Sequence, residues 1–321
     1  MKNKLVDISN ETGVPLKKVY DFLYILKDGH PIENNKLLRM IGVSRNALNQ
    51  IKEMLSGFFE KPSQNTQLLA QKSEGVNALF DSAYSIEESL LSFLTKEDLK
   101  RRTKEFEKYA NLRLSPDRSY DQFTATSETV ARRASLMNFL KDIDDKSIAF
   151  MGDDDFTSIA TALLGRPQKI TVFEIDKRIV KLIREISSKK NLNIEVVEYD
   201  ARKRLPKQFT DSYDIVFTDP PYTTDGVSLF MSRGVDLLDK ESNASRIYLC
   251  YGNSDRARER ILSVQKLLSD SGLMIRYVFD KFNRYVGAES IGSASSLYIA
   301  DVTPMMRPTI QGEFNEKIYT I

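Results

Sequence analysis

The segment from Ser147 to Thr157, SIAFMGDDDFT, constrains the fold more than any other part of this chain. It begins with the apolar run 148–151, continues through Gly152 and three consecutive aspartates, and ends where residues 157–164 have the pattern of a helix. A strand, a tight turn and a helix N-terminus form the opening of a nucleotide-binding βαβ unit. The sequence therefore predicts such a unit here.

The residues of this turn indicate the charge of its ligand. A phosphate-binding turn normally has the pattern G-x-G-x-x-G, because bare backbone N–H groups and the helix N-terminus then point at the phosphate. Here only Gly152 of that pattern is present, and Asp153, Asp154 and Asp155 follow it. Three carboxylates repel a phosphate and attract a cation. The turn is therefore expected to face a positively charged ligand.

Length and composition indicate a soluble globular protein of about two domains. The chain has 321 residues, of which 41% are hydrophobic and 29% are charged. The 47 basic and 45 acidic residues leave a net charge of +2, which argues against nucleic acid as a general partner. With Cys250 as the single cysteine and His30 as the single histidine, we expect neither a disulfide nor a metal site.

The apolar stretches of the chain are short. None approaches the roughly 20 residues of a membrane span. The first ten residues also lack the apolar stretch that is typical of a signal peptide. A cytoplasmic protein without membrane contact is therefore expected.

Residues 1–115 are predicted to form a helical, winged-helix-like domain. Apolar residues recur at helical spacing over 14–26, and shorter helical patterns follow at 34–40 and 48–55. Ser44 is the candidate N-cap of the last of these. Further helical patterns cover 76–94 and 100–109.

A helix, a glycine-containing turn and a second helix are typical of DNA-binding modules. They also occur in helical domains that serve packing or dimerisation. The second helix of the pair carries Arg45 and Lys52 but also Glu53, so it lacks the basic stripe that DNA binding needs. An interaction surface or a substrate cover is therefore favoured over DNA binding.

Residues 116–321 are predicted to form a Rossmann-like, doubly wound α/β domain of the class I methyltransferase type. Strand patterns alternate with helical patterns, which indicates a parallel sheet with helices on both faces. The predicted strands cover residues 148–151, 169–175, 194–199, 213–218, 247–251, 274–279 and 296–302.

Acidic residues follow four of these strands in succession. Glu174 and Asp176 lie about 20 residues after the aspartate turn, the spacing at which a carboxylate accepts hydrogen bonds from a ribose. Asp200 and Ala201 end the next strand, where related folds place adenine. Each acidic residue alone is equally consistent with a surface turn or a helix cap. Together, at the strand ends where α/β sheets bind ligands, they predict a nucleoside site.

The fourth acidic group belongs to Asp219-Pro220-Pro221-Tyr222. Two prolines directly after a strand stiffen the loop and fix the direction of the aspartate before them. This motif resembles the Asp/Asn-Pro-Pro-Tyr of the amino-methyltransferases that act on DNA, RNA or protein glutamine. That resemblance covers the fold and these four residues.

A second resemblance covers nearly the whole chain. The branched-chain polyamine synthases, or N4-bis(aminopropyl)spermidine synthases, also combine a Gly-Asp-Asp-Asp loop with Asp-Pro-Pro-Tyr-Thr. They share a Tyr-Asp-Gln segment, here Tyr120 to Gln122, with Thr126 and Glu128 after it. An N-terminal winged-helix-like domain precedes their Rossmann-like catalytic domain.

This resemblance implies aminopropyl transfer from decarboxylated S-adenosylmethionine to the secondary amine of spermidine. Methylthioadenosine leaves, and a second transfer gives a quaternary, branched product. The donor is a co-substrate, and no separate cofactor is implied. The resemblance also suggests a homodimer. Charge agrees with this chemistry independently, because both substrates carry ammonium groups that suit carboxylates.

The expected roles of the site residues follow. The resemblance implies that an aspartate of the Gly-Asp-Asp-Asp loop is the base, and the last of the three corresponds to Asp155. Asp155 lies nearest the predicted helix, so its side chain is expected to turn into the cleft, and crowding by like charges helps a carboxylate accept a proton. Asp219 and Tyr222 complete the catalytic set. The residues expected to bind the donor are Gly152, Asp153, Glu174, Asp176, Asp200, Ala201 and Gln122. Those expected to bind the acceptor are Asp154, Asp155, Asp219, Pro220, Tyr222, Tyr120 and Glu128.

Two other functions stay open from the sequence. One is a methyltransferase of the Asp-Pro-Pro-Tyr type, although its donor carries a carboxylate that an acidic loop suits less well. The other is a non-catalytic nucleoside-binding regulator. The polar tail 305–321 lacks a clear period and is a candidate mobile cover over the site.

Overall fold

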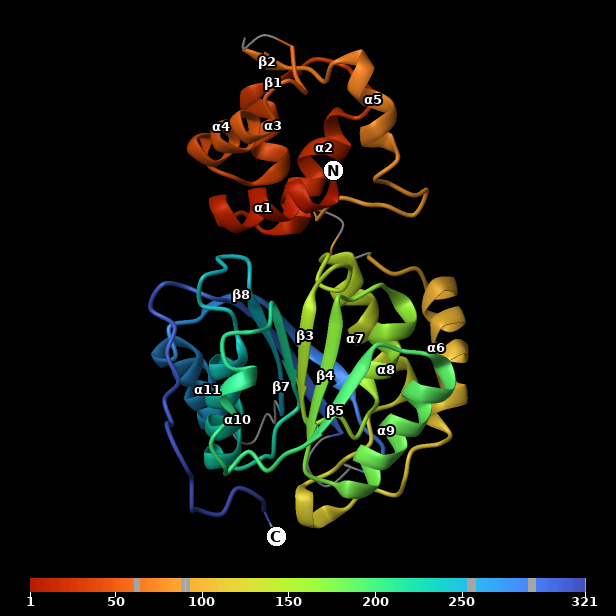
Figure 1. Cartoon of the computed structure of the whole chain (residues 1–321), viewed down its shortest axis with the longest axis vertical. Coiled ribbons are helices and arrows are strands. Elements are labelled where there is room, and N and C mark those ends of the chain that lie inside the picture. Colours follow the sequence, from red (N-terminus) through yellow and green to blue (C-terminus); the bar gives the residue numbers. More distant parts are fainter. Residues whose placement is uncertain (61–63, 88–89, 91–92, 253–257, 288–292, 321) are drawn as a thin grey trace. The chain divides into compact units, whose positions relative to one another are not determined.

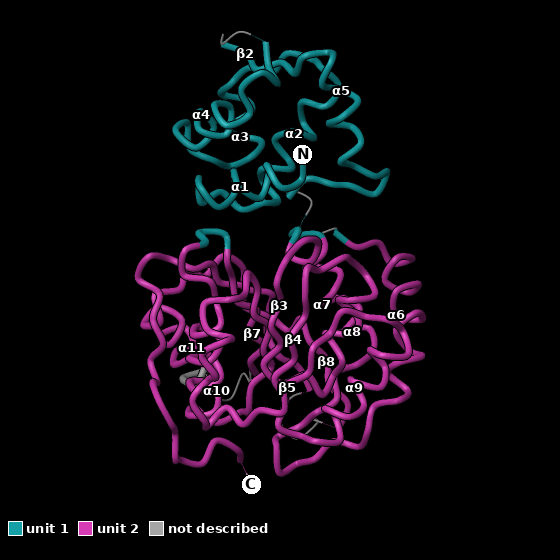
Figure 2. The backbone as a smooth tube through the Cα atoms, viewed as in Figure 1, with its two compact units in different colours: residues 1–93, 139–141, 242–244 teal, residues 94–138, 142–241, 245–321 magenta. Residues whose placement is uncertain are grey.

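The computed structural model describes residues 1–60, 64–87, 90, 93–252, 258–287 and 293–320. The chain divides into two compact units, which Figure 2 shows in different colours. The first contains residues 1–93, 139–141 and 242–244, and the second contains 94–138, 142–241 and 245–321. None of the helices within the described ranges is long and apolar enough to span a membrane.

The division between the units lies near residue 94, whereas the sequence analysis placed it at residue 115. Helix α6 (Lys96–Ala110) accounts for the difference, because it belongs to the second unit. Its Phe106 is buried and lines the same groove as Ala131 and Ala160 of that unit. The charge of α6 suggested an exposed element, but its one apolar face joins it to the second unit.

The first unit is a small helical domain with a two-stranded sheet. Its elements are α1 (Lys2–Thr12), α2 (Leu16–Leu26), β1 (Ile32–Glu33), α3 (Asn34–Ile41), α4 (Arg45–Met54), β2 (Asn65–Thr66) and α5 (Ala70–Asn77). Strands β1 and β2 pair antiparallel, and along the chain they precede and follow the α3–α4 pair. This order agrees with the predicted winged-helix-like domain.

Local capping explains where α4 begins. Ser44 Oγ accepts a hydrogen bond of 3.2 Å from Ala47 N, as the sequence predicted for an N-cap. The helix expected over 76–94 is wrong in its first half, because α5 ends at Asn77 and residues 81–86 are not helical. Positions 88, 89, 91 and 92 of that prediction lie outside the described residues.

The second unit is built on a seven-stranded sheet, with the order β5-β4-β3-β6-β7-β9-β8 (Figure 1). Its strands are β3 (Ser147–Met151), β4 (Lys169–Glu174), β5 (Ile194–Glu198), β6 (Ile215–Thr218), β7 (Arg246–Gly252), β8 (Met274–Arg284) and β9 (Ala294–Asp301). The strands from β5 to β7 in this order are parallel, and β9 is antiparallel to both β7 and β8. All seven predicted strands are present.

Helices cover both faces of this sheet. Helices α7 (Ser127–Phe139), α8 (Thr157–Leu164) and α9 (Lys177–Lys190) lie with α6 on one side, and α10 (Thr224–Leu237) and α11 (Arg258–Asp270) lie on the other (Figure 1). Every residue of β3 is buried, as expected for a parallel strand covered on both faces. The doubly wound fold predicted from the sequence is confirmed.

The strand order determines where a ligand can bind. The chain passes from β3 to β4 on one side of β3, and later returns to β6 on the other side. The loops after β3 and β6 therefore diverge and leave a crevice at the carboxyl ends of these strands. The aspartate turn follows β3 and Asp219 follows β6, so the topology brings two distant acidic motifs together.

The central position of β3 leads to a stability prediction. Phe150 is completely buried and its ring lies 5.6 Å from that of Phe217 on β6. Phe150→Ala is expected to lower the free energy of unfolding by about 3–5 kcal/mol, because the cavity cannot close. Urea unfolding measures this change. Leu262→Ala on α11 is the control, since Leu262 is 66% exposed; an equal loss in both variants would contradict the prediction.

Candidate active site

An open pocket of about 540 Å³ lies at the carboxyl ends of the parallel strands. Four acidic side chains line it, those of Asp121, Asp154, Glu174 and Asp219. Its aromatic lining residues are Tyr120, Phe123, Tyr222, Phe230, Tyr285 and Tyr319, and the remaining ones are Gln122, Gly152, Ile175, Pro220 and Pro221. No Lys, Arg or His is among the described residues that line the pocket.

The aspartate turn begins at Gly152, which has a φ of +74° and lines the pocket. A residue without a Cβ adopts this φ at little cost. The side chain of Asp153 then points back into the protein and accepts from Ser158 N at 3.2 Å and from Ser158 Oγ. It caps the first turn of α8 and does not line the pocket. The expected contact of Asp153 with the donor is therefore not supported by the geometry.

Asp155 is the largest departure from the predicted site. Its Oδ2 lies 3.0 Å from Arg133 Nη1, and its Oδ1 accepts from Ala125 N at 2.6 Å. Arg113 Nη1 approaches the same Oδ1 at 3.9 Å. The expectation that Asp155 turns into the cleft is wrong in this structure, because these partners hold both oxygens away from the pocket. Its role as a base stays a prediction.

Asp154 is the aspartate of the turn that lines the pocket. Burial raises its pKa well above the ordinary value, and the neighbouring carboxylates of Asp155, Glu174 and Asp219 raise it further. Such a group takes up a proton more readily than an ordinary aspartate does. Sequence alone did not distinguish it from the aspartates on either side.

Glu174 ends β4 and also lines the pocket, as expected for a ribose-binding residue. Its Oε2 accepts from Asp153 N at 2.9 Å, and its Oε1 accepts from Asp176 N at 2.8 Å. Burial raises its pKa, although these backbone hydrogen bonds oppose the shift. Each oxygen retains a second lone pair for a ligand, so the backbone fixes the carboxylate without saturating it.

Two other predicted acidic residues do not line the pocket. Asp176 caps α9 and pairs with Arg178 at 2.6 Å. Asp200 pairs with Arg202 at 2.8 Å, and the Ala201 carbonyl accepts from Arg233 Nε at 2.8 Å. In both cases an arginine two residues after the aspartate forms an ion pair with its carboxylate. Direct donor contacts of Asp176, Asp200 and Ala201 are therefore not supported.

Gln122 connects the pocket to one of these groups. It lines the pocket, and its Nε2 donates to Asp176 Oδ2 at 3.1 Å. Tyr120 of the same segment also lines the pocket, as expected. Glu128 does not, because its side chain is 58% exposed and pairs with Arg132 at 3.1 Å along α7. The predicted contact of Glu128 with the acceptor is therefore not supported.

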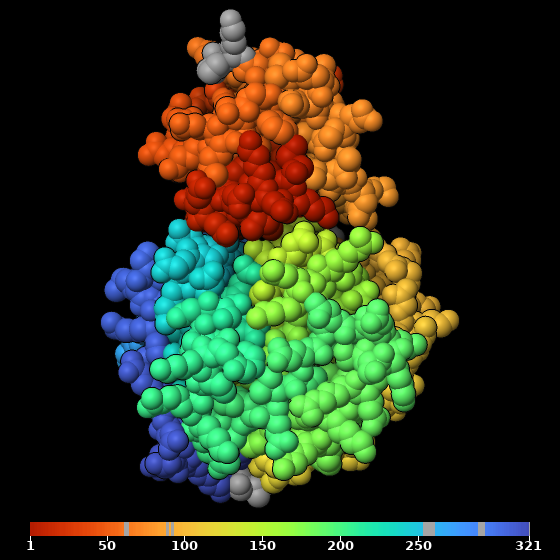
Figure 3. Space-filling model, in the orientation of Figure 1, coloured from red at the N-terminus to blue at the C-terminus, as the bar shows by residue number. Residues whose placement is uncertain are grey.

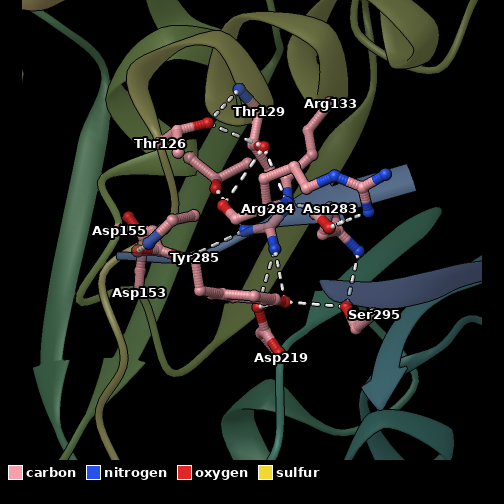
Figure 4. Close-up of polar contacts among 12 residues, drawn as sticks. Thr126, Thr129, Arg133, Asp153, Asp155, Asp219, Asn283, Arg284, Tyr285 and Ser295 are labelled. Atoms are coloured by element: carbon pink, nitrogen blue, oxygen red, sulfur yellow. Dashed lines mark hydrogen bonds and ion pairs between the residues drawn. The ribbon is translucent and has the colours of Figure 1, made fainter. Parts of the chain in front are cut away.

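The Asp-Pro-Pro-Tyr motif lies on the opposite wall, and all four of its residues line the pocket. Asp219 Oδ2 accepts from Arg133 Nη2 and from the Tyr285 hydroxyl, each at 2.7 Å (Figure 4). The Tyr222 ring meets Phe123 edge-on with centroids 5.7 Å apart. The stiff loop therefore presents one carboxylate and one aromatic ring to the same space.

Three residues of this site gave no signal in the sequence. Arg133 lies in the middle of a helical pattern next to another arginine, and Tyr285 directly follows β8. Tyr319 belongs to the tail, which Figures 1 and 3 show in blue along the side of the second unit. Each reaches the pocket or its acidic residues through long-range contacts, which local patterns do not reveal.

The tail is attached to the pocket rim by specific hydrogen bonds. The backbone N–H of Thr320 donates a hydrogen bond of 3.1 Å to the carboxylate of Asp121, and the Thr320 hydroxyl donates to the same carboxylate. The Thr223 hydroxyl donates to the Ile318 carbonyl at 2.6 Å. Tyr319 thereby meets Tyr120 edge-on with centroids 5.6 Å apart. The tail forms part of the pocket wall, and its mobility stays a prediction.

Comparisons with known proteins now identify the family. The sequence profile of the branched-chain polyamine synthase A C-terminal domain matches residues 101–319. The chain belongs to the branched-chain polyamine synthase family. The matched region contains all of the pocket residues described above, and it begins within α6. The family resemblance inferred from the two acidic motifs is confirmed.

Individual relatives agree with this assignment. An N(4)-bis(aminopropyl)spermidine synthase of Methanocaldococcus jannaschii is 31% identical over 286 residues, which cover 88% of this chain and 73% of that protein. An uncharacterised protein of the same organism is 40% identical over 212 residues, or 66% of this chain. The alignment spans about half the length of this second protein, 52%.

A solved structure of a family member has the same fold as this chain. The branched-chain polyamine synthase from Thermus thermophilus, in complex with N4-aminopropylspermidine and 5'-methylthioadenosine, aligns with a TM-score of 0.63 and 22% identity. The alignment covers 99% of this chain and 98% of that one. Within the described residues, no cluster of His, Cys, Asp or Glu has the geometry of a metal site.

Proposed function

We propose that this chain transfers aminopropyl groups from decarboxylated S-adenosylmethionine to the secondary amine of spermidine, giving branched polyamines. One observation carries the proposal: the pocket has four acidic lining residues and no basic one among the residues described. The donor, without its carboxylate, and the acceptor are both cations. A methyltransferase has to accommodate the carboxylate of S-adenosylmethionine, which these acidic walls would repel.

Glu174 is the residue proposed to bind the donor ribose. Its carboxylate is held by two backbone N–H groups and faces the pocket, so it is already oriented for two hydroxyl donors. Gly152 leaves room for the nucleoside because no side chain fills the turn. Ile175 and Tyr319 supply apolar faces in the same pocket, suited to a purine ring.

Asp154 is the residue proposed to accept the proton of the attacking amine. The sulfonium is already a good leaving group, so no general acid is needed. The acceptor amine is mostly protonated near neutral pH and cannot attack until it loses a proton. Burial and three neighbouring carboxylates raise the pKa of Asp154, which favours proton uptake from an ammonium group.

Asp219 and Tyr222 are proposed to orient the acceptor. Asp219 is fixed by Arg133 and Tyr285, and the prolines hold it at the pocket wall. The aromatic face of Tyr222 suits ammonium groups through cation–π attraction. The expected homodimer and cytoplasmic location stay predictions.

A direct assay tests the reaction. Purified protein is incubated with spermidine and either decarboxylated or ordinary S-adenosylmethionine, and the products are identified by mass spectrometry. We expect aminopropylated spermidine and methylthioadenosine with the decarboxylated donor alone. A methylated product formed only with ordinary S-adenosylmethionine would support the methyltransferase alternative and refute the proposal.

Paired variants of the turn test the proton acceptor. Asp154→Asn is expected to lower kcat by roughly 10²-fold, the usual scale for loss of a general base. Its remaining activity should shift to higher pH, where free amine appears without help. Asp155→Asn instead breaks a buried ion pair and is expected to lower the free energy of unfolding by about 3–5 kcal/mol. If a folded Asp155→Asn variant lost turnover while Asp154→Asn kept it, Asp155 would be the base, as the sequence suggested.

Glu174→Gln tests the donor site. The lost charge removes hydrogen bonds that contribute about 1.5–3 kcal/mol, so methylthioadenosine should bind roughly 10- to 100-fold more weakly. Spermidine affinity should change much less. Isothermal titration calorimetry measures both, with Glu185→Gln as the control on exposed α9 surface. Equal weakening of both ligands would show that Glu174 does not bind the ribose.

A further inference from the structure

Arg133 is a buried cation that lies between two acidic motifs of the site. It occupies the inward face of α7, and its side chain is 1% exposed. Nη1 lies 3.0 Å from Asp155 Oδ2, and Nη2 lies 2.7 Å from Asp219 Oδ2 (Figure 4). One guanidinium group therefore joins the aspartate turn after β3 to the Asp-Pro-Pro-Tyr loop after β6.

The remaining donors of Arg133 are fixed mainly from the antiparallel edge of the sheet, and Nη1 also donates to Thr157 Oγ1 at 3.4 Å. Nε donates to Asn283 Oδ1 at 2.8 Å, and Nη2 also donates to the Tyr285 hydroxyl at 3.0 Å. Asn283 and Tyr285 both contact Ser295 Oγ at 2.8 Å. This shell leaves the guanidinium group one orientation, with its two outer nitrogens on the two aspartates.

Asp154 precedes Asp155 in the chain and lines the pocket with Asp219, but it does not share their cation. In the described part of the chain, no hydrogen bond or ion pair joins its side chain to another residue. The charged groups near it are the carboxylates of Asp153, Asp155, Glu174 and Asp219, together with the guanidinium group of Arg113. Asp155 and Asp219 are therefore paired with Arg133, and Asp153 is bound by Ser158. Asp154 is the one aspartate of these two loops whose side chain has no hydrogen-bond or ion-pair partner among the described residues.

We propose that Arg133 is a positioning residue that holds Asp155 and Asp219 in place by ion pairs, so that Asp154 alone accepts the proton of the attacking amine. This inference rests on the proposed aminopropyl transfer. In that step the ammonium group gives its proton to Asp154 Oδ. The nitrogen lone pair then forms the new bond to carbon, the C–S electrons return to sulfur, and neutral methylthioadenosine leaves.

The charges around Arg133 support this division of roles. Its titratable neighbours are Asp155, Asp219, Tyr285 and the buried thiol of Cys250, and Arg113 also approaches Asp155. Burial raises the pKa of Asp155, and Arg133 is the main group that opposes the shift. Without Arg133, the Asp155 carboxylate would lose the main group that lowers its pKa and would compete with Asp154 for protons.

Arg133→Lys tests the proposal, because it keeps a cation but loses the two-nitrogen fork. We expect kcat to fall about 10²-fold, the scale of a misplaced reacting group, while the KM for the donor changes less than threefold. In the pH profile of kcat/KM, the acidic limb should move to higher pH by about one unit or more. Arg132→Lys, on the exposed neighbour that pairs with Glu128, should match the wild type.

Tyr285→Phe is the second variant, in case Arg133→Lys does not fold. It removes the hydroxyl that donates to Asp219 and accepts from Arg133. Its acidic limb should shift in the same direction by a smaller amount. A folded variant of either kind with the pH profile of the wild type would overturn the proposal, since a purely structural role lowers activity without moving the profile.

A readout without substrate separates this inference from the proposed reaction. Infrared titration of the free protein follows the C=O band of protonated carboxyl groups. In Arg133→Lys, and to a smaller extent in Tyr285→Phe, this band should persist to a pH at least half a unit higher than in the wild type. Lack of aminopropyl transfer by the wild type would refute the reaction alone, whereas an unchanged infrared titration would refute the role of Arg133.

Discussion

The pairing of buried Arg133 with Asp155 and Asp219 is the interaction on which this site depends. Two acidic loops that follow different strands meet at the end of the sheet, and like charges brought together in a poorly solvated place repel one another. A guanidinium group with two parallel donors resolves the repulsion for two of the carboxylates at 3.0 and 2.7 Å. Its own burial is offset because Asn283, Tyr285 and Thr157 accept its other hydrogen bonds.

The pocket that results combines the two features a polyamine needs. Carboxylates attract ammonium groups, and aromatic rings offer apolar surface for methylene segments. The rings come from places far apart in the sequence, among them Tyr120 and Phe123 before α7, Tyr222 after β6, and Tyr319 in the tail. The tail can contribute because Thr320 is hydrogen-bonded to Asp121. The chain end is therefore part of the pocket wall.

Much of the second unit was accessible from local pattern. Buried parallel strands such as β3 and β4 are short apolar runs bounded by turn residues. Such runs predict a strand from the local sequence alone. The acidic groups at strand ends were equally visible, because topology places the ends of parallel strands at one edge. Glu174 and Asp219 line the pocket for this reason. The first unit was harder, since the pattern over 76–94 did not distinguish a helix from turns.

The sequence by itself determined the sheet, the family and the acidic character of the site, because each depends on residue type and spacing along the chain. Only the tertiary structure decided which carboxylates face the ligand. Asp153, Asp154 and Asp155 are chemically identical, and their directions depend on Ser158 and Arg133, which the chain supplies from elsewhere. The carboxylates of Asp176 and Asp200 form ion pairs with nearby arginines and do not line the pocket. Arg133, Tyr285 and Tyr319 became visible only on folding, because long-range packing alone brings them to the site.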